Sequence, residues 1–150
     1  MKSAIDLSRT HMSIGAGGPF GAVIVKDGKI ISEGWNQVTS SNDPTAHAEI
    51  VAIRKACEKL EAFDLNGAEI YTSCEPCPMC LSAIYWARID KIYYANTRND
   101  AAAIHFDDEF LYQELKKDIP HRKVPMQQCL HKEAQAVFTE WKNKADKIHY

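Results

Sequence analysis

The sequence predicts an α/β protein of three layers, an α/β/α arrangement in which a mixed sheet of about five strands lies between helices. Two apolar, β-branched runs flank Asp27 and Gly28, the residue pair most typical of a tight hairpin turn, and they predict two antiparallel strands. From residue 68 onward, strand-like and helix-like runs alternate, which is typical of a largely parallel sheet covered on both faces. The 150-residue chain has no internal repeat or linker, so we expect one domain over residues 1–150.

The spacing of apolar residues places each element in turn. The first is a short N-terminal helix, which ends before the Gly- and Pro-rich break at residues 15–19. The β-branched and aromatic runs predict strands at residues 21–25, 30–35, 68–73 and 91–96, and a weak strand at 124–129. Repeats of three or four residues predict helices at residues 47–60, 78–88, 107–115 and 132–145.

Two of the predicted helices have an apolar stripe. The helix at 47–60, whose start we place near Pro44, should bury a stripe made of Ile50, Ile53, Cys57 and Leu60. The last helix carries on one side Ala134, Val137, Phe138 and Trp141. We expect Cys57 and Cys129 to be buried thiols and Trp86 to serve packing.

Composition argues against several kinds of partner. The chain has 18 basic and 20 acidic residues, a net charge of −2, and so gives no electrostatic reason to expect nucleic acid. No apolar stretch approaches the roughly 18 residues of a membrane span, and the N-terminus lacks the apolar core of a signal peptide. We therefore expect a cytoplasmic protein that binds a small molecule and neither nucleic acid nor a membrane.

Residues 71–80, YTSCEPCPMC, gather three of the five cysteines, and a disulfide, a closed structural zinc site and an open catalytic site compete to explain them. A disulfide is the least expected, because the cysteine count is odd and cytosolic thiols stay reduced. Cys77 and Cys80 are three residues apart at a predicted helix N-terminus, where the helix dipole favours the thiolates that zinc requires. Of the six histidines, only His47 lies at the start of another predicted helix, so we expect it to be the third ligand.

The fourth position of the zinc tetrahedron separates a structural site from a catalytic one. Cys74 would close a structural site, whereas a catalytic zinc keeps this position for water. Glu49 favours the catalytic alternative, because it lies about 200° round the helix from His47 and can reach a water molecule without joining the same ligand set. His-x-Glu followed by Pro-Cys-x-x-Cys is a known signature of zinc-dependent nucleobase deaminases.

The segments TAHAEI and SCEPCPMC resemble the cytidine deaminase superfamily. Nearly the whole chain, from GGPFGAVIVKDGKII to FDDEF and Tyr150, is similar to the small bacterial guanine deaminases. This resemblance implies a cytidine deaminase-like fold and one catalytic Zn²⁺ bound by His47, Cys77 and Cys80. It also implies that Glu49 carries protons while guanine is hydrolysed to xanthine and ammonia.

The resemblance further implies contacts with a purine substrate. Asn36 matches an asparagine that holds the base edge, Phe20 matches an aromatic wall of the pocket, and Ala48 matches a substrate-binding position. Asp108 would accept a hydrogen bond from the guanine amino group. Similar enzymes are domain-swapped homodimers in which the C-terminal tail covers the pocket of the partner, so Tyr150 is expected beside the partner's substrate.

Structural roles remain open for these side chains. An asparagine such as Asn36 commonly forms a turn, Phe20 could belong to the core, and Asp108 could cap a helix. Guanosine, cytosine and tRNA adenosine deaminases are alternative functions, although the tRNA enzyme needs a basic surface that a net charge of −2 does not indicate. A zinc-stabilised binding module is the alternative outside enzymes.

Overall fold

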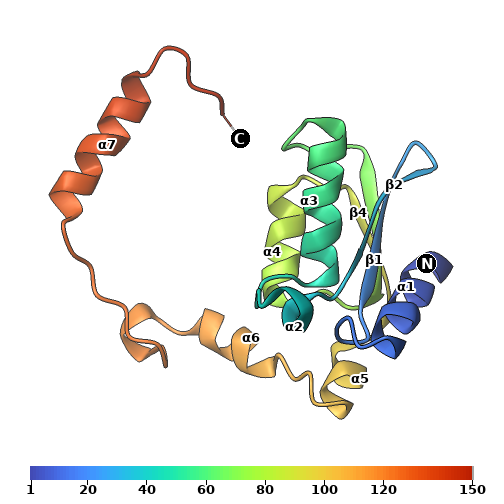
Figure 1. Ribbon diagram of the computed structural model, residues 1–150. Coiled ribbons are helices and arrows are strands. Elements are labelled where there is room, and N and C mark those ends of the chain that lie inside the picture. Colours follow the sequence, from blue (N-terminus) through green and yellow to red (C-terminus); the bar gives the residue numbers. More distant parts are fainter. Residues whose placement is uncertain (150) are drawn as a thin grey trace. The chain divides into compact units, whose positions relative to one another are not determined.

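The computed structural model describes residues 1–149 and divides into two compact units, Met1–Glu109 and the residues from Phe110 onward. In the first unit the helices and strands, labelled in Figure 1, are α1 (Lys2–Ser13), β1 (Gly21–Lys26), β2 (Lys29–Trp35), α2 (Val38–Ser41), α3 (Ala48–Leu60), β3 (Ala68–Cys74), α4 (Pro78–Trp86), β4 (Lys91–Asn96) and α5 (Arg98–Ala103). Helix α6 (Glu109–Lys116) begins at the last residue of this unit. The 3-10 helix η1 (Ile119–His121) and α7 (His131–Asn143) follow in the second unit.

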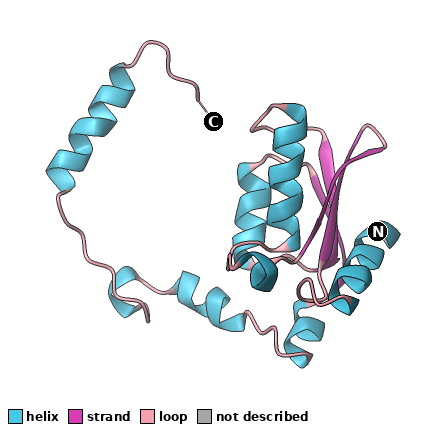
Figure 2. Cartoon of the chain, viewed as in Figure 1, coloured by secondary structure: helices cyan, strands magenta, loops and turns pink. Residues whose placement is uncertain are grey.

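The strands form one sheet in the order β2-β1-β3-β4 (Figure 2). Strand β1 is antiparallel to both β2 and β3, and β4 is parallel to β3, so the expected mixed sheet is confirmed. The expectation of a largely parallel sheet was wrong, because only one of these pairs is parallel. The described chain has four strands, since residues 124–129 form none, and Pro125 in that segment lacks the N–H that a sheet ladder requires.

The β1–β2 hairpin confirms the turn expected from its sequence. Asp27 and Gly28 have φ angles of 52° and 72°, the left-handed backbone that a two-residue type I′ turn requires at both positions. The turn pairs Lys26 with Lys29, and the register of the two strands shifts once, between Ile24 and Val25.

Two glycines show how closely helices approach the sheet on its two sides. A Cβ on Gly21 would lie 2.3 Å from the backbone oxygen of Ala4 in α1, and one on Gly34 would lie 2.2 Å from that of Ala48 in α3. Figure 1 shows α1 on one side of the sheet and α3 with α4 on the other. The three-layer architecture predicted from the sequence is therefore present, and α3 is held directly against β2.

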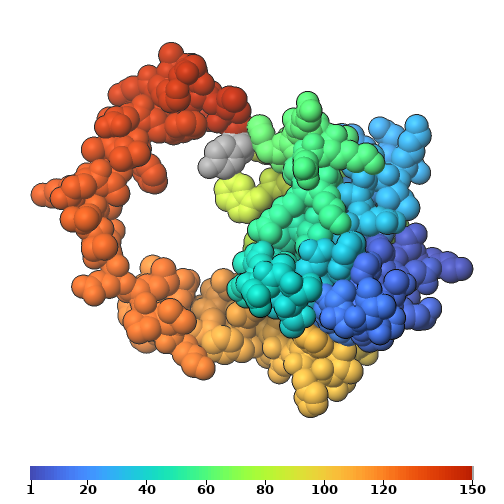
Figure 3. Space-filling view, in the orientation of Figure 1, coloured from blue at the N-terminus to red at the C-terminus, as the bar shows by residue number. Residues whose placement is uncertain are grey.

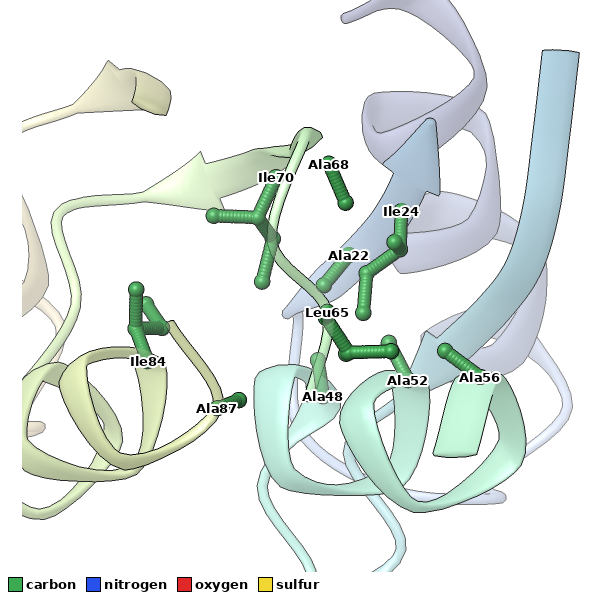
Figure 4. Close-up of a cluster of buried hydrophobic side chains, with 10 residues drawn as sticks. All are labelled: Ala22, Ile24, Ala48, Ala52, Ala56, Leu65, Ala68, Ile70, Ile84 and Ala87. Atoms are coloured by element: carbon green, nitrogen blue, oxygen red, sulfur yellow. The ribbon is translucent and has the colours of Figure 1, made fainter. Parts of the chain in front are cut away.

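The core lies between the sheet and α3 and α4. Figure 4 shows ten buried side chains of this cluster, which are Ala22, Ile24, Ala48, Ala52, Ala56, Leu65, Ala68, Ile70, Ile84 and Ala87. Small alanine side chains let α3 lie close to the strands, which brings the start of this helix near the end of β3.

The buried stripe of α3 differs from the predicted one. Ala48, Ala52 and Ala56 are fully buried, whereas Leu60 is 36% exposed. Of the predicted stripe, Ile50 is buried and Ile53 and Cys57 pack against the core, so only Leu60 was wrong. The most buried face is made of alanines, because α3 lies in close contact with the sheet at Gly34.

Three further expectations need correction. Helix α3 begins at Ala48 rather than near Pro44, because the Asp43 carboxylate accepts hydrogen bonds from the backbone N–H and hydroxyl of Thr45 and forms a turn there. Cys129 is exposed, since the strand expected to bury it does not form, and Cys57 is only partly buried. Helices α2, α5 and η1 were not predicted, and each is six residues or shorter.

The second unit confirms two predicted helices, α6 and α7. Helix α7 exposes three large apolar side chains, with exposed fractions of 59% for Val137, 78% for Phe138 and 42% for Trp141. This helix is coloured orange to red in Figure 3. Among residues 1–149, no helix combines the length and apolar character that a membrane span needs.

Candidate active site

Two helix N-termini bring the three predicted metal ligands together. His47 is the N-cap residue of α3, Cys77 is the N-cap residue of α4, and Cys80 lies in the first turn of α4. The ligand atoms of the three residues lie within 4.8 Å of one another, so the predicted cluster exists in the fold.

The spacing of these ligand atoms fits a zinc ion. His47 Nδ1 lies 3.6 Å from Cys77 Sγ and 3.5 Å from Cys80 Sγ. A tetrahedral zinc with Zn–S bonds of about 2.3 Å and Zn–N bonds of about 2.1 Å places its N and S ligands about 3.6 Å apart. One imidazole and two thiolates are also ligand types that zinc favours, so both the chemistry and the geometry of the cluster fit a zinc ion.

The three ligands form a tightly coupled set of acids and bases. Hydrogen bonds from Cys80 and then from His47 lower the pKa of the Cys77 thiol to about 4. The hydrogen bond to Cys77, reinforced by burial, raises the pKa of Cys80, and the same thiolate raises the pKa of His47. The low pKa of Cys77 suits a metal ligand, since zinc binds cysteine as the thiolate.

Glu49 lies in the first turn of α3 and is 6% exposed. Its Oε2 accepts a hydrogen bond from the Cys80 thiol at 3.5 Å, and its Oε1 accepts one from the Thr72 hydroxyl at 3.3 Å. Burial raises the pKa of this carboxyl group. The carboxylate thus borders the metal ligands while standing outside their group of three.

Cys74 is buried at the end of β3, and its side chain bonds to a residue outside the metal cluster. Its Sγ donates to the backbone oxygen of Thr97 at 3.5 Å, and burial raises its pKa to about 11. Among the described residues, the metal-binding cluster consists of His47, Cys77 and Cys80 without Cys74. This arrangement favours the open site over the closed structural one.

Asn36 follows β2 and is buried. Its Oδ1 accepts hydrogen bonds from the backbone N–H groups of Gly18 and Val38, both at 3.3 Å. These bonds hold the loop before β1 against the end of β2, as the turn-forming alternative anticipated. They also orient the side chain so that its amino group, rather than its oxygen, is turned away from both backbone partners.

Phe20 packs against an aromatic residue that sequence reasoning missed. The rings of Phe20 and Phe106 meet edge to face, with centroids 4.9 Å apart and an interplanar angle of 86°. A Cβ on Gly18 would lie 3.3 Å from both rings, so the small residue makes room for the pair. Phe106 follows the short α5 in a segment without apolar periodicity, and the FDDEF resemblance assigned no role to it.

Asp108 is half-buried after Phe106. Burial, followed by the negative charge of Cys77, raises the pKa of its carboxyl group. The carboxylate of Asp107 accepts from the backbone N–H of Glu109 at 2.9 Å. The side chain that accepts a hydrogen bond from the backbone at the start of α6 is therefore Asp107. The sequence had offered Asp108 as the cap.

The remaining site predictions have different outcomes. Ala48 is fully buried next to His47. Trp86, expected to serve packing, is 69% exposed and lines a surface cavity of about 470 Å³ with Ser82, Tyr85 and Arg88. Tyr150 lies outside the described residues.

Residues 1–96 match the family described as the cytidine and deoxycytidylate deaminase zinc-binding region. The chain belongs to this family of zinc-dependent deaminases. Guanine deaminase of Bacillus subtilis is 53% identical over 150 residues, which cover all of this chain and 96% of that protein. An X-ray structure of guanine deaminase from Bacillus subtilis superposes with a TM-score of 0.96 at 54% identity and covers 99% of this chain and 95% of that one.

Two other relatives share less of the chain. A tRNA-specific adenosine deaminase of Agrobacterium fabrum is 44% identical over 95 residues, which are 63% of this chain and 62% of that protein. The structure of NE0047 in complex with 2,6-diaminopurine has a TM-score of 0.68 at 34% identity and covers 71% of this chain and 60% of that one.

Proposed function

We propose that this protein is a guanine deaminase, which hydrolyses guanine to xanthine and ammonia with one bound Zn²⁺. The observation that carries the proposal is the extent of similarity. Guanine deaminase of Bacillus subtilis matches this chain over its full length, whereas the tRNA-specific adenosine deaminase of Agrobacterium fabrum matches 63% of it. The purine bound in the NE0047 structure agrees with a small purine substrate.

We assign zinc binding to His47, Cys77 and Cys80, whose ligand atoms have the spacing of a tetrahedral site. Bound zinc lowers the pKa of a water molecule to about 7 and so supplies hydroxide at neutral pH. With His47, Cys77 and Cys80 as its ligands, a bound zinc would be able to take this water as well. Cys74 stays outside the set, because its sulfur is engaged with the backbone of Thr97.

We assign proton transfer to Glu49. Its carboxylate accepts a proton from the attacking water, passes it to the ring nitrogen beside C2, and then carries the second proton of the water to the departing amino group. Oxygen from water ends on C2 and the amino group leaves as ammonia, so atoms and protons balance. The position of Glu49 beside Cys80 and outside the ligand group supports this role.

The substrate contacts form a second part of the proposal. Phe20 forms an aromatic wall against which the base stacks, and Ala48 lines the pocket next to the metal ligand His47. The amino group of Asn36 donates to an acceptor on the base edge. The carboxylate of Asp108 accepts from the N–H groups of guanine, and its electrostatic coupling to Cys77 supports a location near the reacting carbon.

Ammonia release tests the proposed function directly. Zinc-loaded protein is incubated separately with guanine, guanosine, cytosine and adenine, and with a tRNA carrying the target adenosine. We expect ammonia from guanine at a rate well above that from the other four. Turnover of the tRNA or of cytosine without turnover of guanine would reject the proposal.

We also propose that the protein is a homodimer in which the C-terminal segment of one subunit covers the pocket of the other, with Tyr150 beside the substrate. Similar guanine deaminases are domain-swapped dimers of this kind. The exposed Val137, Phe138 and Trp141 on α7 support it, since a second copy could cover such an apolar surface. We place this activity in the cytoplasm, where the cysteines stay reduced.

Mixing variants tests the exchange of tails. Deleting residues 148–150 should leave a folded, zinc-loaded protein whose guanine turnover is sharply reduced, since a missing lid affects catalysis more than folding. Mixing this deletion with a Glu49→Ala chain should restore part of the activity, because one heterodimer site then has both an intact tail and an intact Glu49. Failure of the mixture, with subunit exchange verified by a tagged chain, would exclude the swap.

A further inference from the structure

Thr72 is a buried polar residue of β3 that lies in the cysteine-rich segment 71–80 but had no predicted role of its own. It is 1% exposed and lies on the same side of the strand as the core residue Ile70. Its hydroxyl oxygen is 3.3 Å from Glu49 Oε1 and 3.0 Å from the backbone oxygen of Cys74. The single hydroxyl proton therefore lies between two acceptors. One is the Glu49 carboxylate on α3, and the other is the backbone oxygen of Cys74, shortly before Cys77.

This contact divides the two oxygens of Glu49 between different neighbours. Oε1 meets Thr72, and Oε2 meets the Cys80 thiol on the side of the metal ligands. The terminal torsion of a glutamate is broad, so the backbone of α3 alone does not fix which way the carboxylate plane turns. A buried hydroxyl on one oxygen narrows that freedom and keeps the other oxygen directed toward the metal ligands.

We propose that Thr72 is a positioning residue for Glu49. Its hydroxyl holds Oε1, so that Oε2 faces the site where water and substrate react. The same proton is shared with the Cys74 carbonyl oxygen at 3.0 Å, which keeps the hydroxyl oriented at the end of β3. This inference rests on the proposed function, because it takes Glu49 as the proton carrier of the deamination.

The valine variant removes the hydroxyl and preserves the shape of the side chain. Misplacing a reacting group can cost roughly 100-fold in rate, so we expect Thr72→Val to lower kcat for guanine by roughly 10- to 100-fold. The KM for guanine and the zinc content should stay close to wild type, because substrate contacts and metal ligands are unchanged. Thr72→Ser keeps the hydroxyl and should retain most of the kcat.

Ser32→Ala is the matched control. Ser32 is also a buried strand residue, and its hydroxyl donates to the backbone oxygen of Ala52 in α3 at 2.7 Å. Its loss removes a hydroxyl bond to the same helix without touching Glu49. We expect this variant to lower the melting temperature while leaving kcat within about two-fold of wild type, because neither reacting groups nor their orientation change.

A double-mutant cycle separates positioning from a general structural effect. In a Glu49→Ala background, Thr72→Val should cause no further loss of residual activity, since the group that it positions is already absent. An equal loss in both backgrounds would overturn the proposal. So would loss of zinc in Thr72→Val, or a wild-type kcat in that variant.

Guanine turnover by the wild-type protein shows whether a negative result speaks against the role of Thr72 or against the proposed function. If the wild-type protein does not deaminate guanine, the proposed function fails and Thr72 has no Glu49-dependent reaction to support. If the wild type turns over guanine and Thr72→Val does so equally well, the function stands and the positioning role is wrong.

Discussion

The two units of the chain differ in how their apolar residues are used. In Met1–Glu109 alanines and isoleucines are buried between the sheet, α3 and α4, and the three metal ligands lie at two helix starts beside this core. Between residues 110 and 149 no side chain is buried, and Val137, Phe138 and Trp141 of α7 are exposed. Among the described residues, the candidate metal site therefore consists of residues of the first unit, whereas α7 in the second unit exposes apolar side chains.

This difference gives a direct expectation for substitutions. Changes in the first unit should separate into those that remove chemistry, those that remove metal and those that remove the fold. Changes in the second unit should affect assembly or closure and leave the metal in place.

The largest effect is expected from Glu49→Ala. General acid–base catalysis contributes roughly 10²- to 10⁴-fold, so guanine turnover should fall by about that factor. Zinc content, measured by atomic emission, should remain near one ion per chain because all three ligands are intact. Turnover near the wild-type rate would show that another group carries the proton.

Two cysteine variants sharpen the distinction between an open and a closed metal site. Cys77→Ser should lose most of its zinc and nearly all activity, because a thiolate ligand is removed. Cys74→Ser should keep stoichiometric zinc and measurable activity, since its sulfur bonds to Thr97 rather than to the metal ligands. Equal zinc loss in the two variants would revive the closed structural site.

Gly34→Ala tests the close packing of α3 against β2. The added Cβ would lie 2.2 Å from the Ala48 oxygen and 2.7 Å from the Ala52 nitrogen, so α3 must move away from β2. Overpacking of this kind costs about 1 to 3 kcal/mol in the free energy of unfolding, which a urea titration would measure. An unchanged unfolding midpoint would mean that α3 is free to shift without cost.

Asp108→Ala tests substrate recognition. A buried donor of guanine left without its acceptor costs about 1 to 3 kcal/mol, so kcat/KM for guanine should fall accordingly. Any side activity on cytosine should change less, because cytosine presents a carbonyl where guanine presents N–H groups. Equal losses on both bases would assign Asp108 a purely structural role.

Sequence patterns predicted the parts of this protein that depend on local chemistry. The hairpin follows from the φ angles that Asp27 and Gly28 tolerate, and the metal ligands follow from two cysteines and one histidine at helix starts. These features are local because a helix terminus or a turn is specified within a few residues.

The features that sequence reasoning missed depend on contacts between distant segments. The alanines of α3 face the protein core because Gly34 lets the helix approach the sheet closely. The apolar periodicity of this helix alone predicts that its larger isoleucines face the core instead. Thr72 meets Glu49 across 23 residues of sequence, and Phe106 meets Phe20 only after α5 has turned the chain back. Strand alternation could have placed Thr72 on the helix-covered side of β3, but it gives no hint of the carboxylate opposite.

The central claim is that a zinc site built by the first unit deaminates guanine. The most direct test follows xanthine and ammonia together, with zinc-loaded protein and with protein stripped by a chelator. The account predicts equimolar xanthine and ammonia from the zinc-loaded protein, loss of both on chelation, and recovery when one equivalent of zinc is restored. Guanine left unchanged by fully zinc-loaded protein would contradict it.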